Sequence, residues 1–228
     1  MSKRLGLMLG AGLAGAAIAG YALVIRPWHL RWGTREGEAQ LPLPGDELVP
    51  HPMYESTRAI TIHAPAFRVW QWLVQLGVGR GGFYTYDVLE NMAGLGIQSA
   101  DQIRPEWQAL QPGDSIHISS VTPLLVERLE ANRHLVLHTV MSPFTAEIVD
   151  AADPATPTYL DWTWAFVLDE IAAQTTRLVV RVRANYKPDA LRVGVLALLE
   201  PVHFLMERGM LQGLKRRAES DAAGSQWA

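Results

Sequence analysis

The sequence predicts an α+β domain in which an antiparallel sheet packs against one long C-terminal helix. An alternating, β-branched stretch at 58–63 precedes an amphipathic helical stretch, and several further strand patterns are separated by short turn signals. From Pro188 to Arg217 the apolar residues recur at helical spacing. A meander of antiparallel strands buries one face, so this long helix is the expected cover of that face.

Composition limits the classes of protein to which the chain can belong. With 228 residues there is room for one domain plus appendages, and 49% apolar against 19% charged residues is typical of a folded chain. A net charge of −3 gives no electrostatic footprint for nucleic acid, so we expect no nucleic-acid partner. The absence of cysteine excludes disulfides, a thiolate zinc site and a cysteine nucleophile.

The first part of the chain predicts a membrane anchor. After a short tail at 1–4, residues 5–25 form an uncharged apolar run of 21 residues. As a helix, such a run spans about 30 Å, the thickness of a bilayer core. Trp28 follows at the headgroup level, so we expect a single-pass membrane protein. The alternative is a cleaved signal peptide, because residues 17–19 offer a small-residue cleavage pattern, although the apolar run continues beyond them to Ile25.

The orientation of this anchor stays open. Positive charges flank the run in similar number on both sides, so the positive-inside rule does not say which side of the membrane the domain faces. Gly6 and Gly10 form a GxxxG pattern. This pattern indicates either a weak homodimer or chance in a segment rich in Gly and Ala.

Residues 26–53 predict a proline-rich linker. Pro42, Pro44, Pro50 and Pro52 favour extended backbone and exclude a stable helix. We expect a semi-rigid spacer that holds the domain off the bilayer. The alternative is a docking site for a partner that recognises proline-rich segments.

The domain itself begins with a strand and a helix. The strand at 58–63 is followed by Pro65, which suits the first turn of a helix that runs up to Gly77. A glycine-rich loop at 79–82 then leads to a short helix predicted at 86–92.

Strand patterns dominate the middle of the chain, and a helix ends it. A turn at 131–133 joins two of the strands as a hairpin, and Pro201 is expected to kink the final helix. The predicted strands are 115–119, 124–130, 135–141, 144–149, 158–168 and 177–186, and the final helix is 188–217.

The two longest predicted strands each have one apolar face. Arg177, Arg181 and Arg183 lie on the opposite face, where they point to solvent or to acidic side chains. The apolar face is either ordinary core or the wall of a cavity beneath the long helix. Its members are Leu160, Trp162, Trp164, Phe166 and Leu168 of one strand and Leu178, Val180, Val182 and Ala184 of the other.

Three stretches carry a resemblance to a known superfamily. They are GRGGFYTYDVLENMAGLGIQSADQIRPEWQALQPGD at 79–114, TRLVVRVRANY at 176–186 and HFLMERGMLQGLKRRAE at 203–219. Over residues 54–219 the chain resembles the START-like SRPBCC superfamily, in a bacterial branch labelled polyketide cyclase/dehydrase-like. The resemblance implies the helix-grip fold, in which a curved antiparallel sheet wraps around the C-terminal helix with an apolar cavity between them. It leaves 220–228 as a disordered tail, and it implies no chemistry, because this fold hosts carriers, sensors and a few enzymes.

Motifs for catalysis or metal binding are lacking in the sequence. No HExxH, Walker loop, GxGxxG or GxSxG is present. His134 and His138 are spaced i, i+4, but in the predicted strand this spacing spans about 13 Å, too far for one metal ion. We expect no metal site and no cofactor, and we assign no catalytic residue. The carboxylates around 86–92 either act beside the cavity or cap helices and turns.

A binding module for a hydrophobic small molecule, lipid- or isoprenoid-like, is the function that these observations favour. One alternative is a cyclase- or hydrolase-type enzyme that uses acid and base residues of the cavity, and another is a structural domain with a filled interior. The predicted ligand-binding residues are Tyr84, Tyr86, Glu90, Trp162, Trp164, Val180, Val182 and Leu198.

Overall fold

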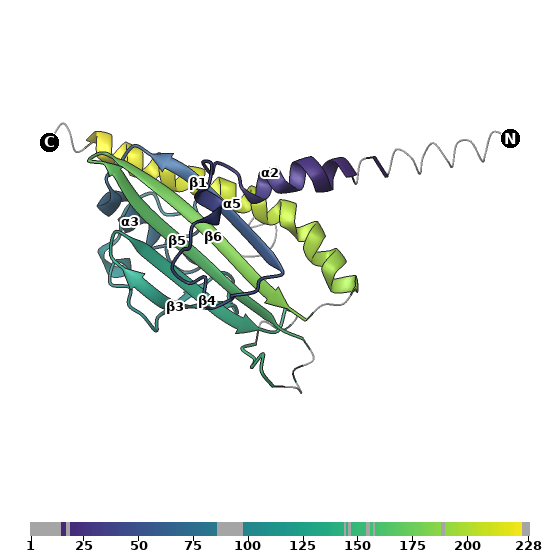
Figure 1. Ribbon diagram of the computed structural model, residues 1–228. Helices are drawn as coiled ribbons and strands as arrows, with labels where there is room; N and C mark the ends of the chain where they lie inside the picture. The colour runs from purple at the N-terminus through teal and green to yellow at the C-terminus, as the bar shows by residue number, and fades with distance from the viewer. Residues whose placement is uncertain are drawn as a thin grey trace.

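The computed structural model describes most of the predicted domain and the segment that precedes it. The described residues are 15–16, 19–85, 98–143, 145, 147–153, 156, 158–187 and 190–224, except for the side chains of 190–198 and 222–224. Within them the chain forms a sheet with a long helix on one face and a segment of turns on the other (Figure 1).

One antiparallel sheet forms the centre of the domain. Its strands are β1 (Tyr54–Ile62), β2 (Ser115–His117), β3 (Pro123–Glu130), β4 (His134–Met141), β5 (Leu160–Ala172) and β6 (Thr175–Tyr186). Their order across the sheet is β1-β6-β5-β4-β3-β2, and neighbouring strands are antiparallel throughout. Strands β2 to β6 follow one another as a meander, whereas β1 pairs with the last strand. The predicted α+β class and antiparallel sheet are confirmed.

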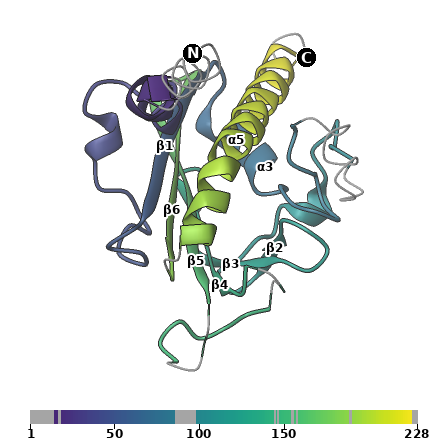
Figure 2. The ribbon, with the colours of Figure 1, turned by 90° about the vertical axis from the view of Figure 1, so that its right-hand side faces the viewer.

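A long C-terminal helix, α5 (Ala190–Gly224), lies across one face of the sheet, with α3 (Ala66–Leu73) beside it (Figure 1 and Figure 2). This arrangement is consistent with the helix-grip fold that the resemblance implies. The helix continues beyond its predicted end at Arg217, and Asp221 accepts a hydrogen bond of 2.9 Å from the indole N–H of Trp72. Residues 220–224, expected in a disordered tail, therefore belong to the helix, while 225–228 lie outside the described residues.

Short helical turns precede the sheet and the loop region. They are η1 (Tyr21–Ile25), α2 (Arg26–Leu30), η2 (Glu38–Gln40) and η3 (Pro105–Trp107). A π-helical turn, η1, leads directly into α2, which contacts both β1 and α5.

Pro201 lies inside α5. Proline has no N–H for the helical ladder and its ring clashes with the preceding turn, so a change of direction is expected there. In Figure 1 the N-terminal part of α5 is inclined to the rest of the helix and extends past the end of the sheet. This part of the helix covers the cavity described below.

The face of the sheet beneath α5, here called the inner face, carries the hydrophobic core. Alternate residues of a strand point to the same face, so Trp164 and Phe166 of β5 join Leu211 of α5 in one buried cluster. Gly213 permits the close approach of α5 to the loop that follows α3. A Cβ atom at this position would lie 2.0 Å from the carbonyl oxygen of Tyr84, which a larger residue could not accommodate.

Residues 26–53 do not form the predicted spacer. Residues 31–50 lie against the other face of the sheet, the outer face, on the side opposite α5 (Figure 2), whereas α2 contacts β1 and α5. Arg177 of β6 binds Glu38 through Nε at 2.8 Å and the carbonyl oxygen of Gly33 through Nη2 at 2.6 Å. Residues 31–50 contain η2 and hydrogen-bonded turns, and their carboxylates and carbonyl groups attach them to β6. We refer to residues 31–50 as the outer segment.

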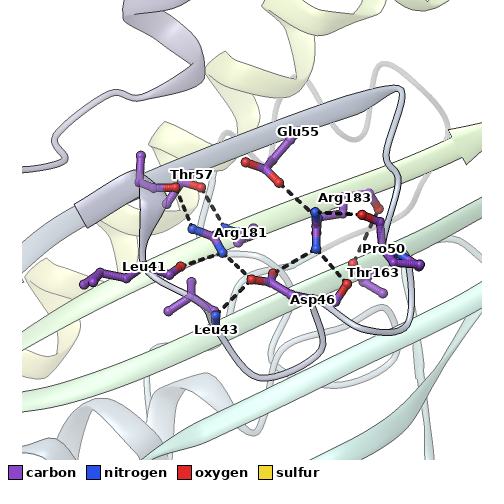
Figure 3. A network of polar contacts seen from close by, with 10 residues as sticks. Leu41, Leu43, Asp46, Pro50, Glu55, Thr57, Thr163, Arg181 and Arg183 are labelled. Carbon is purple, nitrogen blue, oxygen red and sulfur yellow. Dashed lines mark hydrogen bonds and ion pairs between the residues drawn. The ribbon is translucent and has the colours of Figure 1, made fainter. Parts of the chain in front are cut away.

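Figure 3 shows the polar contacts that hold the outer segment in place. Arg181 donates to Asp46 Oδ2 at 2.6 Å, to the carbonyl oxygen of Leu41 at 2.9 Å and to the hydroxyl of Thr57 at 2.9 Å. Arg183 binds the backbone carbonyl of Asp46 at 2.7 Å and Glu55 at 3.0 Å. The arginines of β6 therefore face acidic side chains rather than solvent.

Several predicted features lie outside the described residues. These include most of the predicted transmembrane segment 5–25, with Gly6 and Gly10, and the short helix predicted at 86–92. In the part of the chain that the structure describes, no helix combines the length and the apolar character needed to cross a membrane. Where a strand was predicted at 144–149, the described residues contain a β-bridge between Met141 and Ile148.

Candidate functional site

A cavity of about 270 Å³ lies between the inner face of the sheet and the N-terminal half of α5. It is located where β1 begins and β6 ends, and most of its wall is apolar. Small-molecule sites have volumes of about 300–1,000 Å³, so this cavity is near the lower end of that range. Its lining residues are Tyr54, Leu160, Trp162, Val182, Ala184, Tyr186, Leu199, Glu200 and His203. We call it the main cavity.

A second cavity of about 160 Å³ continues along α5 toward the middle of the domain. Trp162 and His203 belong to the walls of both cavities, so their side chains separate the two spaces. The second cavity is lined by Phe83, Thr85, Ile118, Trp162, Trp164, His203, Met206, Glu207 and Met210.

Stacked aromatic rings form one wall of these cavities. The ring centroids of Trp162 and Trp164 are 6.0 Å apart with an interplanar angle of 23°, and Trp164 contacts Phe166 at 4.9 Å. Trp164 is buried, whereas Trp162 is partly buried at the boundary of the core. Among the described residues, the indole N–H of Trp162 has no hydrogen-bond partner. A wall of this composition suits an apolar ligand.

A buried ion pair lies beside the cavities. Arg58 projects from β1 to the inner face, and its Nη1 lies 2.5 Å from Oε2 of Glu207 on α5, with side-chain exposures of 0% and 1%. The indole N–H of Trp164 donates to Oε1 of Glu207 at 3.0 Å, and Nε of Arg58 donates to the carbonyl oxygen of His29 at 2.8 Å. Both carboxylate oxygens are thus engaged, as a buried charge requires.

His203 connects this ion pair to the cavities. Its Nδ1 lies 3.2 Å from Nη1 of Arg58 and 3.4 Å from the hydroxyl of Tyr54. Because a guanidinium group can only donate, Nδ1 must be the acceptor, and the proton of the neutral ring is on Nε2. Burial lowers the pKa of His203, and the charge of Arg58 lowers it further, against the opposing effect of Glu207. Nε2 lies 3.9 Å from Oε1 of Glu207, which is beyond hydrogen-bond distance.

Glu200, the carboxylate in the described lining of the main cavity, is also paired. Arg26 of α2 donates to its two oxygens from Nε at 2.7 Å and from Nη2 at 2.9 Å. Trp28 contacts Phe204 of α5 edge to face, with centroids 5.3 Å apart. These contacts attach α2 to α5 at the side of the cavity.

Among the described residues that line the main cavity, no charged side chain lacks a partner of opposite charge. The remaining polar groups are neutral. Burial raises the pKa of Tyr54 and of Tyr186, so both hydroxyls stay protonated at neutral pH. Such a site can hold an uncharged apolar molecule.

The predicted ligand-binding residues are distributed unevenly around these spaces. Trp162 lines both cavities, Val182 lines the main cavity, and Trp164 lines the second cavity. Val180 is buried in the hydrophobic core and does not belong to either lining. Tyr86 and Glu90 lie outside the described residues, and the side chain of Leu198 is not described.

Tyr84 is buried in the core against Gly213 of α5 and belongs to neither cavity lining. Its hydroxyl donates to the carbonyl oxygen of Trp72 at 3.0 Å, and the guanidinium of Arg217 lies 4.5 Å from the centre of its ring. Burial raises the pKa of Tyr84. The loop position that suggested a ligand contact thus serves packing between α3 and α5.

Arg58, Glu207, His203 and Tyr54 were not predicted from the sequence. A signal for Arg58 was present, because it occupies an inward position of a strand whose other inward residues include Ile60 and Ile62. For the helix, the i, i+4 spacing of His203 and Glu207 on an otherwise apolar side was the corresponding signal.

Other hollows and clusters of the described residues differ in character from the main cavity. A larger groove of about 600 Å³ lies between the outer segment and the outer face, but its charged lining residues include Arg181, Arg183, Asp46 and Glu55, which pair with one another. Over the described residues, no group of three or more His, Asp or Glu side chains is arranged to hold a metal ion.

Comparisons with known proteins give structural likeness without sequence relationship. No protein-family model and no curated protein sequence matches the chain. The hypothetical protein jhp0584 of Helicobacter pylori is similar with a TM-score of 0.45 and 11% identity, over 78% of this chain and 95% of that one. Protein MLL2253 of Mesorhizobium loti has a TM-score of 0.39 and 17% identity, over 72% and 98%.

A third similar structure is the di-domain ARO/CYC protein BexL from the BE-7585A biosynthetic pathway. Its TM-score is 0.37 and its identity 16%, over 73% of this chain and 47% of BexL. At these identities and scores the likeness is no basis for conclusions about function. The helix-grip arrangement therefore rests on the strand order and on the position of α5.

Proposed function

We propose that this chain is a START-like (SRPBCC) domain that binds a hydrophobic small molecule in the main cavity. The observation that carries the proposal is an apolar cavity of about 270 Å³ beneath α5, with an aromatic wall and paired charges. A lipid- or isoprenoid-like molecule has the matching chemistry. Burial of about 300 Å² of apolar ligand surface at roughly 25 cal/mol/Å² favours binding by about 7–8 kcal/mol before the cost of association. That corresponds to micromolar affinity at best.

Ligand binding is tested first by native mass spectrometry and solvent extraction of the purified protein, which should reveal a co-purified apolar molecule. Fluorescent fatty acids, isoprenoids and polycyclic aromatics are then titrated. Val182→Trp should fill the main cavity and abolish saturable binding, whereas Ile171→Trp, at an exposed position near the β5–β6 turn, should leave it unchanged. Equal binding by both variants would contradict the proposal.

A cyclase- or hydrolase-type enzyme is the second candidate. The observation that favours it is a carboxylate, Glu207, in the wall of the second cavity. Both oxygens of this carboxylate already accept hydrogen bonds, from Arg58 and Trp164, and the Nδ1 lone pair of His203 faces two donors. A general base needs a free lone pair within reach of the substrate proton, so binding without reaction is better supported. Conversion of a bound ligand to product, lost in Glu207→Gln, would instead establish the enzyme.

Membrane attachment through residues 5–25 belongs to the same proposal. Leu23, Val24 and Trp28 are 77%, 68% and 57% exposed at the point where the uncharged run ends. Exposed apolar side chains of this size suit the bilayer interface. Removal of residues 1–19 keeps η1 and α2, and it should release the protein from the membrane fraction in a folded form. A truncated protein that stays in the membrane fraction would place the attachment elsewhere.

A further inference from the structure

His203 is the side chain from which the chemistry of the ligand can be inferred. Its ring lines both cavities, and 30% of its side chain is exposed. The edge of the ring that carries Nδ1 is directed at Arg58 and Tyr54, at 3.2 and 3.4 Å. The Nε2 edge has no hydrogen-bond partner among the described residues, because Glu207, at 3.9 Å, is beyond hydrogen-bond distance.

The ion pair behind the ring fixes which hydrogen-bonding role Nε2 can take. Arg58 is charged at all relevant pH values and has donors only, so its proximity excludes a proton on Nδ1. A proton on both nitrogens would place a second positive charge beside the guanidinium in a buried site. The His203 ring is therefore neutral with its proton on Nε2, and Nε2–H is a hydrogen-bond donor.

We propose that the main cavity binds an uncharged apolar molecule whose oxygen accepts a hydrogen bond from Nε2–H of His203. This inference rests on the proposed binding function and names its ligand class: long-chain ketones, alcohols or esters rather than free acids or plain hydrocarbons. The indole N–H of Trp162, which lacks a partner among the described residues, is a second donor between the two cavities. Both groups are donors to which a ligand oxygen could bind.

Charge explains why a free carboxylate is a poor ligand here. The cations nearest the cavities, Arg58 and Arg26, are already bound to Glu207 and Glu200. A ligand carboxylate would therefore enter beside two carboxylates, would gain no free cation among the side chains that the structure describes, and would lose its hydration. An alcohol or a ketone loses far less hydration and satisfies the same donor.

The experiment uses the full chain and four probes of equal length: decane, 1-decanol, 2-decanone and decanoate. At roughly 30 Å³ for each water-sized group, a chain of ten carbons needs about 300 Å³, which the main cavity of about 270 Å³ and the adjoining second cavity of about 160 Å³ together provide. Binding is followed by NMR through the indole N–H resonance of Trp162. We expect decanol and decanone to bind about 2- to 10-fold more tightly than decane, the equivalent of one net hydrogen bond, and decanoate to bind most weakly.

Variants assign this preference to one side chain. His203→Phe should reduce decanone to the affinity of decane, His203→Gln should retain part of the preference through its amide donor, and His138→Phe on the outer face should leave it unchanged. In the ligand-free protein, long-range ¹H–¹⁵N spectra should show His203 neutral with the proton on Nε2. A proton on Nδ1, or a protonated ring at pH 7, would overturn the inference.

The possible failures can be told apart. Tight binding of decanoate, or unchanged preference in His203→Phe while Val182→Trp still blocks every probe, would overturn the ligand class and leave the binding function standing. No saturable shift with any of the four probes would overturn both.

Discussion

The two faces of the sheet both carry arginines, but they use them differently. On the outer face, Arg177 and Arg181 bind carboxylates of the outer segment and several backbone carbonyl groups as well. On the inner face, Arg58 binds the carboxylate of Glu207 and the carbonyl oxygen of His29, and this ion pair is fully buried in the core. The ion pairs of the outer face attach the outer segment to the sheet. The ion pair of the inner face joins α5 to β1 beside the two cavities.

The two faces differ in how far water can reach the carboxylate of each ion pair. The acids on the outer face are 12% and 22% exposed for Glu38 and Asp46, so water can replace part of a lost contact. Glu207 is 1% exposed and has no such replacement. Loss of one partner should therefore cost more on the inner face than on the outer face.

The largest expected effect concerns the aromatic wall. Trp164→Ala removes a buried indole, which costs about 3–5 kcal/mol in unfolding free energy, and it leaves Glu207 without one donor, which costs about 1–3 kcal/mol more. Trp162→Ala should cost less, because Trp162 already borders empty space and donates no hydrogen bond to a described residue. Urea unfolding followed by circular dichroism measures both, and equal losses would mean that the two rings are packed alike.

The next effect tests the inner ion pair directly. Glu207→Ala leaves a buried guanidinium unpaired and should cost about 3–5 kcal/mol. The double variant Arg58→Met/Glu207→Leu removes both charges and should recover most of this loss. If the double variant is as unstable as the single one, the pair is not the source of the cost.

A smaller loss is expected on the outer face. Asp46→Ala removes the carboxylate bound to Arg181, which keeps its bonds to Leu41 and Thr57. We expect a cost of about 1–3 kcal/mol and faster proteolysis within the outer segment, measured by limited digestion. A cost as large as that of Glu207→Ala would show that the two faces do not differ.

The smallest effect is a pH dependence of opposite sign on the two faces. On the outer face, the hydrogen bond to Asp161 raises the pKa of His138 above 6.5, against a smaller effect of burial. Its contribution to stability is therefore present below pH 6.5 and is lost as the pH rises through the folded-state pKa. His203 has a lowered pKa, so its contribution is present above pH 6.5 and is lost as the pH falls.

Histidine variants separate these two contributions. Between pH 5 and 8, the urea midpoint of His138→Gln should decline less toward high pH than that of the unsubstituted protein. The midpoint of His203→Gln should decline less toward low pH. Part of the acid effect should remain in His203→Gln, because burial also lowers the pKa of His29. Parallel pH profiles for both variants would contradict the opposite signs.

Sequence patterns predicted the faces of the sheet because they depend on local periodicity. The two-residue alternation in β5 and β6 placed Trp162, Trp164 and Val182 on the inner face, where they lie. The strand order itself was not predicted, since the pairing of β1 with β6 depends on contacts between distant parts of the chain.

Long-range polar contacts were the features that sequence patterns missed. The prolines of 26–53 suggested an extended spacer, whereas this part of the chain contains α2, η2 and hydrogen-bonded turns and packs on the domain. Its attachment depends on Glu38 and Asp46 meeting arginines that lie far along the chain. In the same way, the sequence shows Glu207 only as one charged residue of a helix. Its role depends on the contact with Arg58, which lies far away along the chain.

The pairing of β1 with β6 has a consequence for synthesis of the protein. Tyr54 lies opposite Ala184, so 130 residues separate these partners. At about 5–20 residues per second, a ribosome needs roughly 7–26 s to bring the second partner out after the first. During that interval β1 has an unpaired edge, and neither the outer segment nor α2 has its docking surface. A chaperone therefore has a defined interval in which to protect β1.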